Sequence, residues 1–252
     1  MAGRTLQGKT ALVTGAGKRM GRAIAIALAE EGVNIVIHYP YTAEEASELC
    51  TELHDRRVKS WLVKADFEVA AEYETLVARS LEMAGSLDIL VNNASTFPAN
   101  TLKNVDLAAL TKNMQVNAWA PFVLSRDFAR LVGRGQIVNL LDSRISGYDW
   151  KHVAYILSKH VLSVLTKMTA LEFAPHIAVN GVAPGLILPP PGKDHTFLDR
   201  MADSVPLKRH GDPCYIADAV IYLLKTDFVT GEVIHVDGGR HLMEHGDGSH
   251  ID

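Results

Sequence analysis

Tyr155 and Lys159 are the residues of this sequence whose types and spacing most directly indicate proton chemistry. They form Y-x-x-x-K inside residues 153–173, where the apolar pattern has a helical period, so both lie one turn apart on the same helix face. A phenol has an ordinary pKa of about 10, and a nearby ammonium group favours the phenolate. We therefore expect Lys159 to tune Tyr155 for proton transfer. The alternative for such a pair, taken alone, is two surface residues on an amphipathic helix.

A glycine-rich stretch near the N-terminus, TGAGKRMGR at residues 14–22, has the composition of a phosphate-binding turn. Its glycines do not fit the general G-x-G-x-x-G fingerprint, because their spacing is G-x-G-x-x-x-G. Lys18 and Arg19 beside a helix N-terminus would add positive charge to backbone N–H groups that point at a phosphate. The alternative is an exposed arginine on an ordinary strand-to-helix turn.

The segment after the second expected strand decides which dinucleotide would bind. Sites that prefer NAD place a carboxylate there to accept a hydrogen bond from the ribose 2′-hydroxyl, and this carboxylate would repel a 2′-phosphate. Here the segment reads HYPYT: His38, Tyr39 and Thr42 supply donors, and no acidic residue occurs before Glu44. Together with the two cations of the glycine-rich stretch, this segment predicts NADPH/NADP+ as the cofactor.

Short apolar runs alternate with longer helical patterns along the whole chain. Since doubly apolar strands that alternate with helices form parallel sheets covered on both faces, we expect an α/β fold: a Rossmann-type doubly wound parallel sheet. No linker, repeat or change of composition divides residues 1–252, so a single domain is expected. Gly32 predicts the end of a helix over residues 21–32, and Thr42 and Glu45 predict a capping box for a helix over residues 42–57. The expected strands are residues 11–13, 33–39, 58–66, 88–94, 136–142, 177–184 and 232–239.

Composition and charge exclude several classes of protein. The 252 residues are 48% hydrophobic, which is ample for a core, and the net charge of -4 provides no basic field for nucleic acid. Nowhere do eighteen apolar residues occur together, so no membrane partner is expected. Cys50 and Cys214 are far apart and lack metal-ligand spacing, which favours a reducing compartment. We therefore expect a cytoplasmic protein without disulfides.

The arrangement of these motifs resembles the short-chain dehydrogenase/reductase family, whose glycine turn reads T-G-x-x-x-G-x-G. Thr14, Gly15 and Gly21 match this turn, and Arg19 takes the place of its middle glycine. The resemblance continues with an asparagine-rich turn after the fourth strand, the tyrosine and lysine already named, and the turns after the last two strands, so it spans nearly the whole chain.

The resemblance assigns roles to particular positions. It implies that Lys159 also holds the nicotinamide ribose, that Asn117 anchors a water-linked proton path, and that Asp66 contacts the adenine. For Asp66 a simple helix cap is the alternative. The expected catalytic residues are Asn117, Asp142, Tyr155 and Lys159. The expected cofactor-binding residues are Thr14, Gly15, Lys18, Arg19, Met20, Gly21, His38, Tyr39, Thr42, Asp66, Asn93, Ala94, Lys159, Pro184 and Gly185.

Departures from the family pattern indicate the substrate. Asp142 stands where the family has a serine, and an ionised carboxylate would oppose an oxyanion on a ketone but would suit a substrate that offers N–H donors. Ser95 replaces a glycine, and Phe97 follows it with a flat ring that could stack a heteroaromatic substrate; core packing is the alternative for Phe97. Where the family has a threonine after Gly185, this chain has Pro189.

These departures resemble the pteridine reductase branch of the family, including bacterial dihydromonapterin and dihydrofolate reductases. The resemblance implies NADPH-dependent reduction of a dihydropterin, with Arg19 reaching across the cofactor phosphates toward the substrate. It also implies a substrate loop at about residues 186–208 and a homotetramer. The expected substrate-binding residues are Arg19, Ser95, Phe97, Asp142 and Tyr155.

Three other interpretations remain open. A carbonyl reductase, for instance of 3-oxoacyl carriers, would need Asp142 to be protonated or Ser143 to substitute for it. An idle NADPH-binding or regulatory protein is disfavoured by the intact tyrosine, lysine and asparagine. A metal site formed by the last histidines is also considered, but we interpret residues 241–252 as a polar tail, because glycines and a serine provide no rigid element for ligands.

Overall fold

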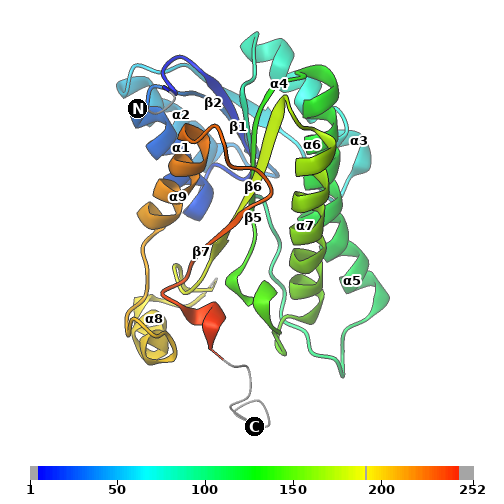
Figure 1. Ribbon diagram of the computed structural model, residues 1–252, viewed down its shortest axis with the longest axis vertical. Helices are drawn as coiled ribbons and strands as arrows, with labels where there is room; N and C mark the ends of the chain where they lie inside the picture. The colour runs from blue at the N-terminus through cyan, green and yellow to red at the C-terminus, as the bar shows by residue number, and fades with distance from the viewer. Residues whose placement is uncertain (1–4, 191, 244–252) are drawn as a thin grey trace.

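The computed structural model describes residues 5–190 and 192–243. Its centre is a seven-stranded parallel sheet in the order β3-β2-β1-β4-β5-β6-β7, with helices on both faces (Figure 1). This arrangement confirms the predicted α/β doubly wound class. The strands are β1 (Thr10–Val13), β2 (Asn34–Tyr39), β3 (Ser60–Lys64), β4 (Ile89–Asn92), β5 (Gly135–Leu140), β6 (Ile177–Pro184) and β7 (Val233–Val236).

Helices cover the sheet as two layers. On one face α1, α2 and α9 enclose a core with β1 and β2; on the other, α4, α6 and α7 pack against the same strands (Figure 1). Among the described residues, none of the helices is long and apolar enough to cross a bilayer. The helices are α1 (Arg19–Glu30), α2 (Glu44–Asp55), α3 (Ala70–Tyr73), α4 (Leu76–Ala84), α5 (Leu107–Met114), α6 (Ala120–Leu131), α7 (Val153–Glu172), α8 (His195–Met201) and α9 (Pro213–Lys225).

The strand order reverses between β1 and β4, and this reversal places the site. β1 pairs in parallel with β2 on one side and with β4 on the other, so Val13 lies beside both Ile37 and Val91. The segment after β1 leads to a helix on one face of the sheet, and the segment after β4 leads to helices on the other face. A crevice therefore opens beyond the carboxyl ends of these two strands. The glycine-rich turn and the asparagine-rich turn therefore meet at this crevice.

The starts and ends of the helices test the local predictions. Gly32, with φ +77°, ends α1 as predicted. The predicted capping box is wrong: α2 begins at Glu44 after Ala43, and no side chain caps it. Ala43 is already in the right-handed helical region, whereas a capping residue needs an extended backbone. Thr42 is exposed, and Glu45 pairs instead with Lys18.

A π-helical segment, η1 (Gln115–Trp119), joins α5 to α6 and contains Asn117. The wider turn of a π-helix is commonly found at functional sites, because it redirects a side chain without ending the helix. Here Asn117 is fully buried against α7 and the segment after β4.

Candidate active site

The turns after β1 and β4 are held together by the hydroxyl of Thr14. This hydroxyl donates to the Val91 carbonyl at 3.3 Å and accepts from the N–H groups of Asn93 and Ala94 at 2.8 and 2.9 Å. The side-chain amide of Asn93 donates back to the Thr14 carbonyl at 2.8 Å. Gly15 turns here with φ +63°, which glycine adopts without strain. These predicted cofactor residues therefore form one rigid frame.

Gly21 allows α1 to start close to this frame. A Cβ at Gly21 would lie 2.2 Å from the Gly15 carbonyl oxygen, so only glycine fits. The residue before α1, Lys18, is extended and provides no side-chain cap, and the first turn of α1 contains no acidic residue. Since the N–H groups of a helix N-terminus bind anions, this turn fits the pyrophosphate of a dinucleotide.

Arg19 has φ +53° at the place where the family has a glycine. A left-handed conformation costs a residue with a Cβ about 1–2 kcal/mol. The guanidinium donates to the Pro189 carbonyl at 2.7 Å and so connects the glycine-rich turn to the predicted substrate loop. This contact runs in the direction that the sequence predicted for Arg19. Met20 is half-buried and packs against the core below the turn.

His38 does not offer a donor to a cofactor, and this part of the prediction is wrong. Its side chain is buried at 1% exposure and stacks on Phe67. Its Nδ1 accepts from the Gly15 N–H at 3.0 Å and its Nε2 donates to the Ala65 carbonyl at 2.8 Å. Burial lowers the pKa of His38 to about 4, so the ring is neutral. Its role is to fix the glycine-rich turn.

The remaining residues predicted to bind the adenosine end lie around the end of β2. Lys18 and Glu45 are exposed and form an ion pair at 3.4 Å. Tyr39 packs against the core with part of its ring exposed. Asp66 accepts from the Glu68 N–H at 2.9 Å, as expected of a turn cap. The assignment of Asp66 to adenine stays a prediction.

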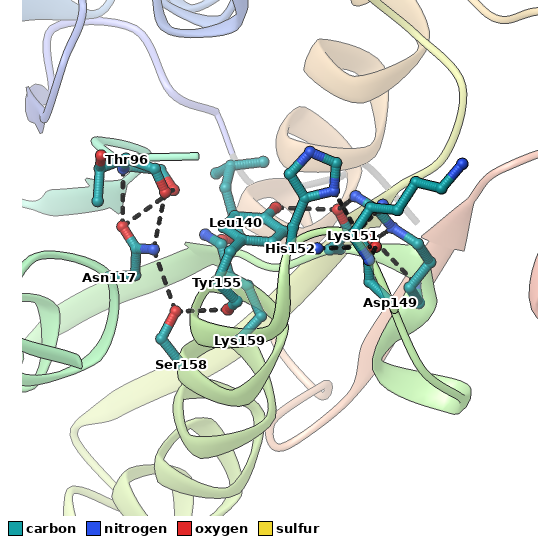
Figure 2. A network of polar contacts seen from close by, with 12 residues as sticks. Thr96, Asn117, Leu140, Asp149, Lys151, His152, Tyr155, Ser158 and Lys159 are labelled. Carbon is teal, nitrogen blue, oxygen red and sulfur yellow. Dashed lines mark hydrogen bonds and ion pairs between the residues drawn. The ribbon is translucent and has the colours of Figure 1, made fainter. Parts of the chain in front are cut away.

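The predicted proton-transfer group assembles at the end of β5. The Tyr155 hydroxyl donates to Asp142 Oδ2 at 2.9 Å, and Lys159 Nζ donates to the Leu140 carbonyl at 2.7 Å (Figure 2). The Lys159 Nζ lies 5.7 Å from the centre of the Tyr155 ring. The helix period of α7 therefore brings the pair to one face, as predicted.

The pKa of Tyr155 shifts in the opposite direction to the one we predicted. Burial and the negative charge of Asp142 raise it well above 10, and Arg144 only partly opposes them. Burial lowers the pKa of Lys159 to about 8, while the charge of Asp142 acts in the other direction. Burial and the carboxylate of Asp142, which accepts the hydrogen bond from the phenol, together outweigh the opposing charge of Arg144. Tyr155 is therefore a phenol that retains its proton.

Asp142 is nevertheless ionised. Burial acts to raise its pKa, but the charge of Arg144, three hydrogen bonds from Arg144 and one from Tyr155 outweigh burial and hold the pKa below its ordinary 3.8. The carboxylate is therefore a hydrogen-bond acceptor. It suits a substrate that offers N–H donors and would oppose the oxyanion that forms on a ketone.

Asn117 connects α7 to the segment after β4. Its Oδ1 accepts from the Thr96 N–H at 2.8 Å and from the Ser95 hydroxyl at 3.1 Å. Its Nδ2 donates to the Thr96 carbonyl at 3.0 Å and to the Ser158 hydroxyl at 3.1 Å (Figure 2). These contacts fix the backbone beside Tyr155. The water-linked proton path assigned to Asn117 stays a prediction.

Phe97 lies at the centre of an aromatic group beside Tyr155. Its ring stacks on His152 with centroids 3.9 Å apart and meets the Tyr155 ring edge-on at 4.5 Å. It is half-buried rather than part of the core, so core packing does not explain it. One face of Phe97 is thus already covered by an imidazole, which the sequence did not predict.

Three residues that sequence reasoning missed complete this group: Arg144, Asp149 and His152. Arg144 pairs with both Asp142 and Asp149, and His152 Nδ1 lies 2.8 Å from Asp149 Oδ2 (Figure 2). Burial acts to raise the pKa of Asp149, but the hydrogen bond to His152 and the charge of Arg144 lower it to about 2. Arg144 follows Asp142 closely in sequence, and this proximity was the available signal.

The turns after β6 and β7 also meet. A Cβ at Gly185 would lie 2.4 Å from Asp237 Cβ, and the Gly185 N–H donates to the Val236 carbonyl at 3.0 Å. Pro184 pairs in register with Val236. Asp237 accepts from the His241 N–H at 2.7 Å, which fixes the start of the predicted tail. The rest of that tail, residues 244–252, lies outside the described residues.

A family model described as enoyl-(acyl carrier protein) reductase matches residues 15–241. The chain belongs to the short-chain dehydrogenase/reductase family and is an oxidoreductase. Among its relatives, pteridine reductase 1 of Leishmania tarentolae is 34% identical over 92% of this chain and 96% of the relative. A 3-oxoacyl-[acyl-carrier-protein] reductase, FabG of Staphylococcus epidermidis, is 32% identical over 93% of this chain and 99% of the relative.

Two solved structures of dihydrofolate reductases are similar to this chain over nearly its whole length. FolM alternative dihydrofolate reductase 1 from Brucella canis, complexed with NADP, superposes with a TM-score of 0.89 and 30% identity over 98% of this chain and all of that chain. The protein of the same name from Brucella suis, also in complex with NADP, has a TM-score of 0.89 and 29% identity over 95% of this chain and 97% of that chain. The predicted resemblance to the pteridine reductase branch is confirmed.

Proposed function

We propose that this protein uses NADPH to reduce a dihydropterin, such as dihydromonapterin, dihydrobiopterin or dihydrofolate, to its tetrahydro form. The observation that carries the proposal is the ionised Asp142, which accepts a hydrogen bond from Tyr155 where the family has a serine. A pterin offers N–H donors to such a carboxylate. A ketone offers only an acceptor, and the growing oxyanion would be repelled.

The residues divide the work between binding and proton transfer. NADPH, when bound, supplies the hydride. Thr14, Asn93 and the N-terminus of α1 would hold its phosphates, and we assign Lys159 to the nicotinamide ribose, as the family resemblance implies. Tyr155 donates a proton to the pterin ring nitrogen next to the carbon that receives the hydride, and Phe97 provides a stacking surface. We assign Ser95 and Arg19 to the same substrate site.

NADPH is proposed over NADH because no acidic side chain directly follows β2 and because Lys18 and Arg19 lie on the adjoining turn. The structures complexed with NADP support this proposal. Glu45 pairs with Lys18, so we expect Lys18 to exchange this partner for the 2′-phosphate. Measured dissociation constants for both cofactors test the choice, and equal affinities would contradict it.

A carbonyl reductase that acts on 3-oxoacyl carriers is the second candidate. The similarity to the 3-oxoacyl-[acyl-carrier-protein] reductase favours it. An idle cofactor-binding protein is less well supported, because Tyr155, Lys159 and Asn117 are all present and come together. NADPH oxidation with a panel of dihydropterins, dihydrofolate and an acetoacetyl thioester decides between the two enzymes. Turnover of the thioester alone would overturn the pterin proposal.

A homotetramer is proposed from two exposed apolar surfaces. The first is a stripe along α7 whose members recur at helical spacing, every third or fourth residue. Such a stripe on a helix that already buries its other face suits a second copy of the same chain. The stripe consists of Leu157, Val161, Val164, Met168 and Leu171.

The second surface is proposed on α9, which lies at the other face of the sheet from α7 (Figure 1), where Tyr222 is exposed; Phe228, which is 99% exposed, follows α9 in the chain. Two separate self-complementary surfaces generate a closed tetramer. Light scattering should give four times the chain mass of 27.5 kDa. Val164→Glu with Met168→Glu should yield smaller species, whereas Val69→Glu on another exposed apolar residue should not. A monomeric wild type would contradict the proposal.

A cytoplasmic location is proposed from the cysteines. Cys50 and Cys214 are both free thiols, and Cys214 is exposed. Exposed thiols persist where glutathione and thioredoxin keep them reduced. Cell fractionation with a compartment marker tests this location, and recovery from an oxidising compartment would contradict it.

A further inference from the structure

Arg144 contacts three of the residues assigned to the substrate. Its N–H and Nε donate to Asp142 Oδ1, both at 2.9 Å, and its Nη2 donates to Asp142 Oδ2 at 2.9 Å. Its guanidinium carbon lies 5.5 Å from the centre of the Phe97 ring and 5.9 Å from that of Tyr155. The remaining nitrogen pairs with Asp149, which holds the guanidinium from the other side. No motif in the sequence assigns Arg144 a role.

The acceptor capacity of Asp142 is filled in this arrangement. A carboxylate has about four lone-pair positions on its two oxygens. Arg144 donates three hydrogen bonds to Asp142, and the Tyr155 hydroxyl donates the fourth, to Oδ2. A substrate N–H can therefore bond to Asp142 only if one of these donors leaves. Arg144 is fixed by Asp149, so the exchangeable donor is Tyr155.

We propose that Arg144 is a positioning residue that keeps Asp142 an ionised acceptor with one exchangeable position, so that a substrate N–H takes the place of the Tyr155 hydroxyl and releases it for proton transfer. This inference rests on the proposed function and explains how the site selects its substrate. A ketone lacks an N–H, so it cannot displace Tyr155 from Asp142. The site thus favours a dihydropterin over a ketone in two ways: the substrate N–H replaces the Tyr155 hydroxyl at Asp142, and the carboxylate repels an oxyanion.

The proton step balances with NADPH as the reductant. The hydride adds to the pterin ring carbon, the Tyr155 O–H bond breaks, and its proton forms a new N–H bond on the adjacent nitrogen. The electron pair of the broken bond stays on the phenolate oxygen, which regains a proton from solvent. The substrate is reduced by two electrons, NADPH is oxidised to NADP+, and one proton is consumed.

Several charged or titratable groups surround Asp142 and Arg144 and contribute to the pH dependence of kcat and KM. They come from the segment before α7, from α7 itself, from β7, and from the segment Arg240–Leu242, which packs against the helical turn that contains Arg144. These groups are Asp149, His152, Tyr155, Lys159, His235, Arg240 and His241.

The first experiment is a pH profile of kcat and KM for dihydropterin reduction in wild type, Arg144→Gln and Arg144→Lys. Without the cation, burial raises the pKa of Asp142, so the acid limb of kcat/KM should move up by about 1–3 pH units and KM should rise more than kcat falls. Arg144→Lys restores the charge, so its acid limb should return toward wild type. Loss of activity by the same factor at every pH, with unmoved limbs, would overturn the proposal.

Arg130→Gln is the matched control. Arg130 lies 3.3 Å from another buried carboxylate, that of Asp127 on α6, which contains none of the predicted site residues. This variant should leave the acid limb unchanged. A shift as large as that of Arg144→Gln would mean that any lost cation moves the profile, and the proposal would fail.

Infrared difference spectra test the same claim without turnover. At about pH 5, wild type minus Asp142→Asn should show a carboxylate band and no protonated-carboxyl band, whereas the same difference in the Arg144→Gln background should show a protonated-carboxyl band. A protonated Asp142 in wild type would overturn the proposal even if Arg144→Gln fails to fold. If no dihydropterin is reduced but the spectra agree, the proposed function fails and the positioning of Asp142 by Arg144 stands.

Discussion

At the glycine-rich turn, side chains hold the backbone: the Thr14 hydroxyl, the Asn93 amide and the His38 ring all bond to main-chain groups. At the end of β5, side chains hold one another: Arg144 joins Asp142 to Asp149 through charged hydrogen bonds. In the first region neutral side chains fix the shape of the backbone, and in the second charged side chains fix protonation states.

The two regions should therefore respond differently to change. Loss of a backbone support alters the stability of the turn and the affinity for the cofactor. Loss of a charged partner alters protonation, and so it changes catalysis and its pH dependence.

Tyr155→Phe should abolish proton donation while the fold and NADPH binding stay nearly intact, because only a hydroxyl is removed. General acid catalysis is typically worth about 10²–10⁴-fold, so kcat should fall by that factor or more. Steady-state kinetics and a cofactor titration measure the two effects separately. A variant that retains most of its turnover would remove Tyr155 from the mechanism.

His38 should make the fold sensitive to acid. Its pKa is about 4 in the folded chain against an ordinary 6.5, so between these pH values the unfolded chain binds a proton that the folded chain does not. The free energy of unfolding should therefore decrease as pH falls from 6.5 to 4, by about 3 kcal/mol at 1.36 kcal/mol per pKa unit. Urea unfolding across this range, compared with His38→Asn, measures the difference. Equal slopes in both proteins would contradict the burial argument.

Phe97→Ala should raise KM for the dihydropterin and leave NADPH affinity largely unchanged. Aromatic stacking contributes about 0.5–1.5 kcal/mol beyond area burial, which corresponds to roughly a two- to tenfold rise in KM from stacking alone. Phe97→Leu keeps apolar volume without a ring and should show most of that rise. If both variants have the KM of wild type for the dihydropterin, Phe97 packs only against His152 and Tyr155 and does not stack on the substrate.

Arg19 separates backbone strain from the function of its side chain. Arg19→Gly and Arg19→Ala both lose the hydrogen bond to Pro189, but only glycine relieves the φ of +53°. The left-handed conformation costs about 1–2 kcal/mol, and the extra entropy of unfolded glycine offsets about half of this cost. The glycine variant should unfold with a free energy about 0.5–1 kcal/mol higher than the alanine variant. Equal stabilities would show that the turn relaxes around alanine.

Sequence reasoning predicted the order of strands and helices well, because doubly apolar strands and Gly32 are local signals. It also predicted, from their spacing, that Tyr155 and Lys159 lie on one helix face, whereas Asn117 was assigned through the family resemblance.

The prediction for His38 was wrong: the residue was interpreted as a donor to the cofactor, but its ring is buried and supports the backbone of the glycine-rich turn. Sequence reasoning also missed Arg144, although the ion-pair partners Asp142 and Asp149 lie two residues before it and five after it, because neither hydrophobic periodicity nor a family motif marks such a local ion pair.

The central claim is that Asp142 makes this site a reductase of N–H-donating heterocycles rather than of ketones. The most direct measurement is kcat/KM of wild type and Asp142→Ser with a dihydropterin and with an acetoacetyl thioester, both with NADPH. Serine in place of the carboxylate should impair dihydropterin reduction and leave thioester reduction unchanged or improved, so kcat/KM for the dihydropterin divided by kcat/KM for the thioester should fall. Unchanged dihydropterin turnover in Asp142→Ser, or thioester turnover that depends on Asp142, would contradict the claim.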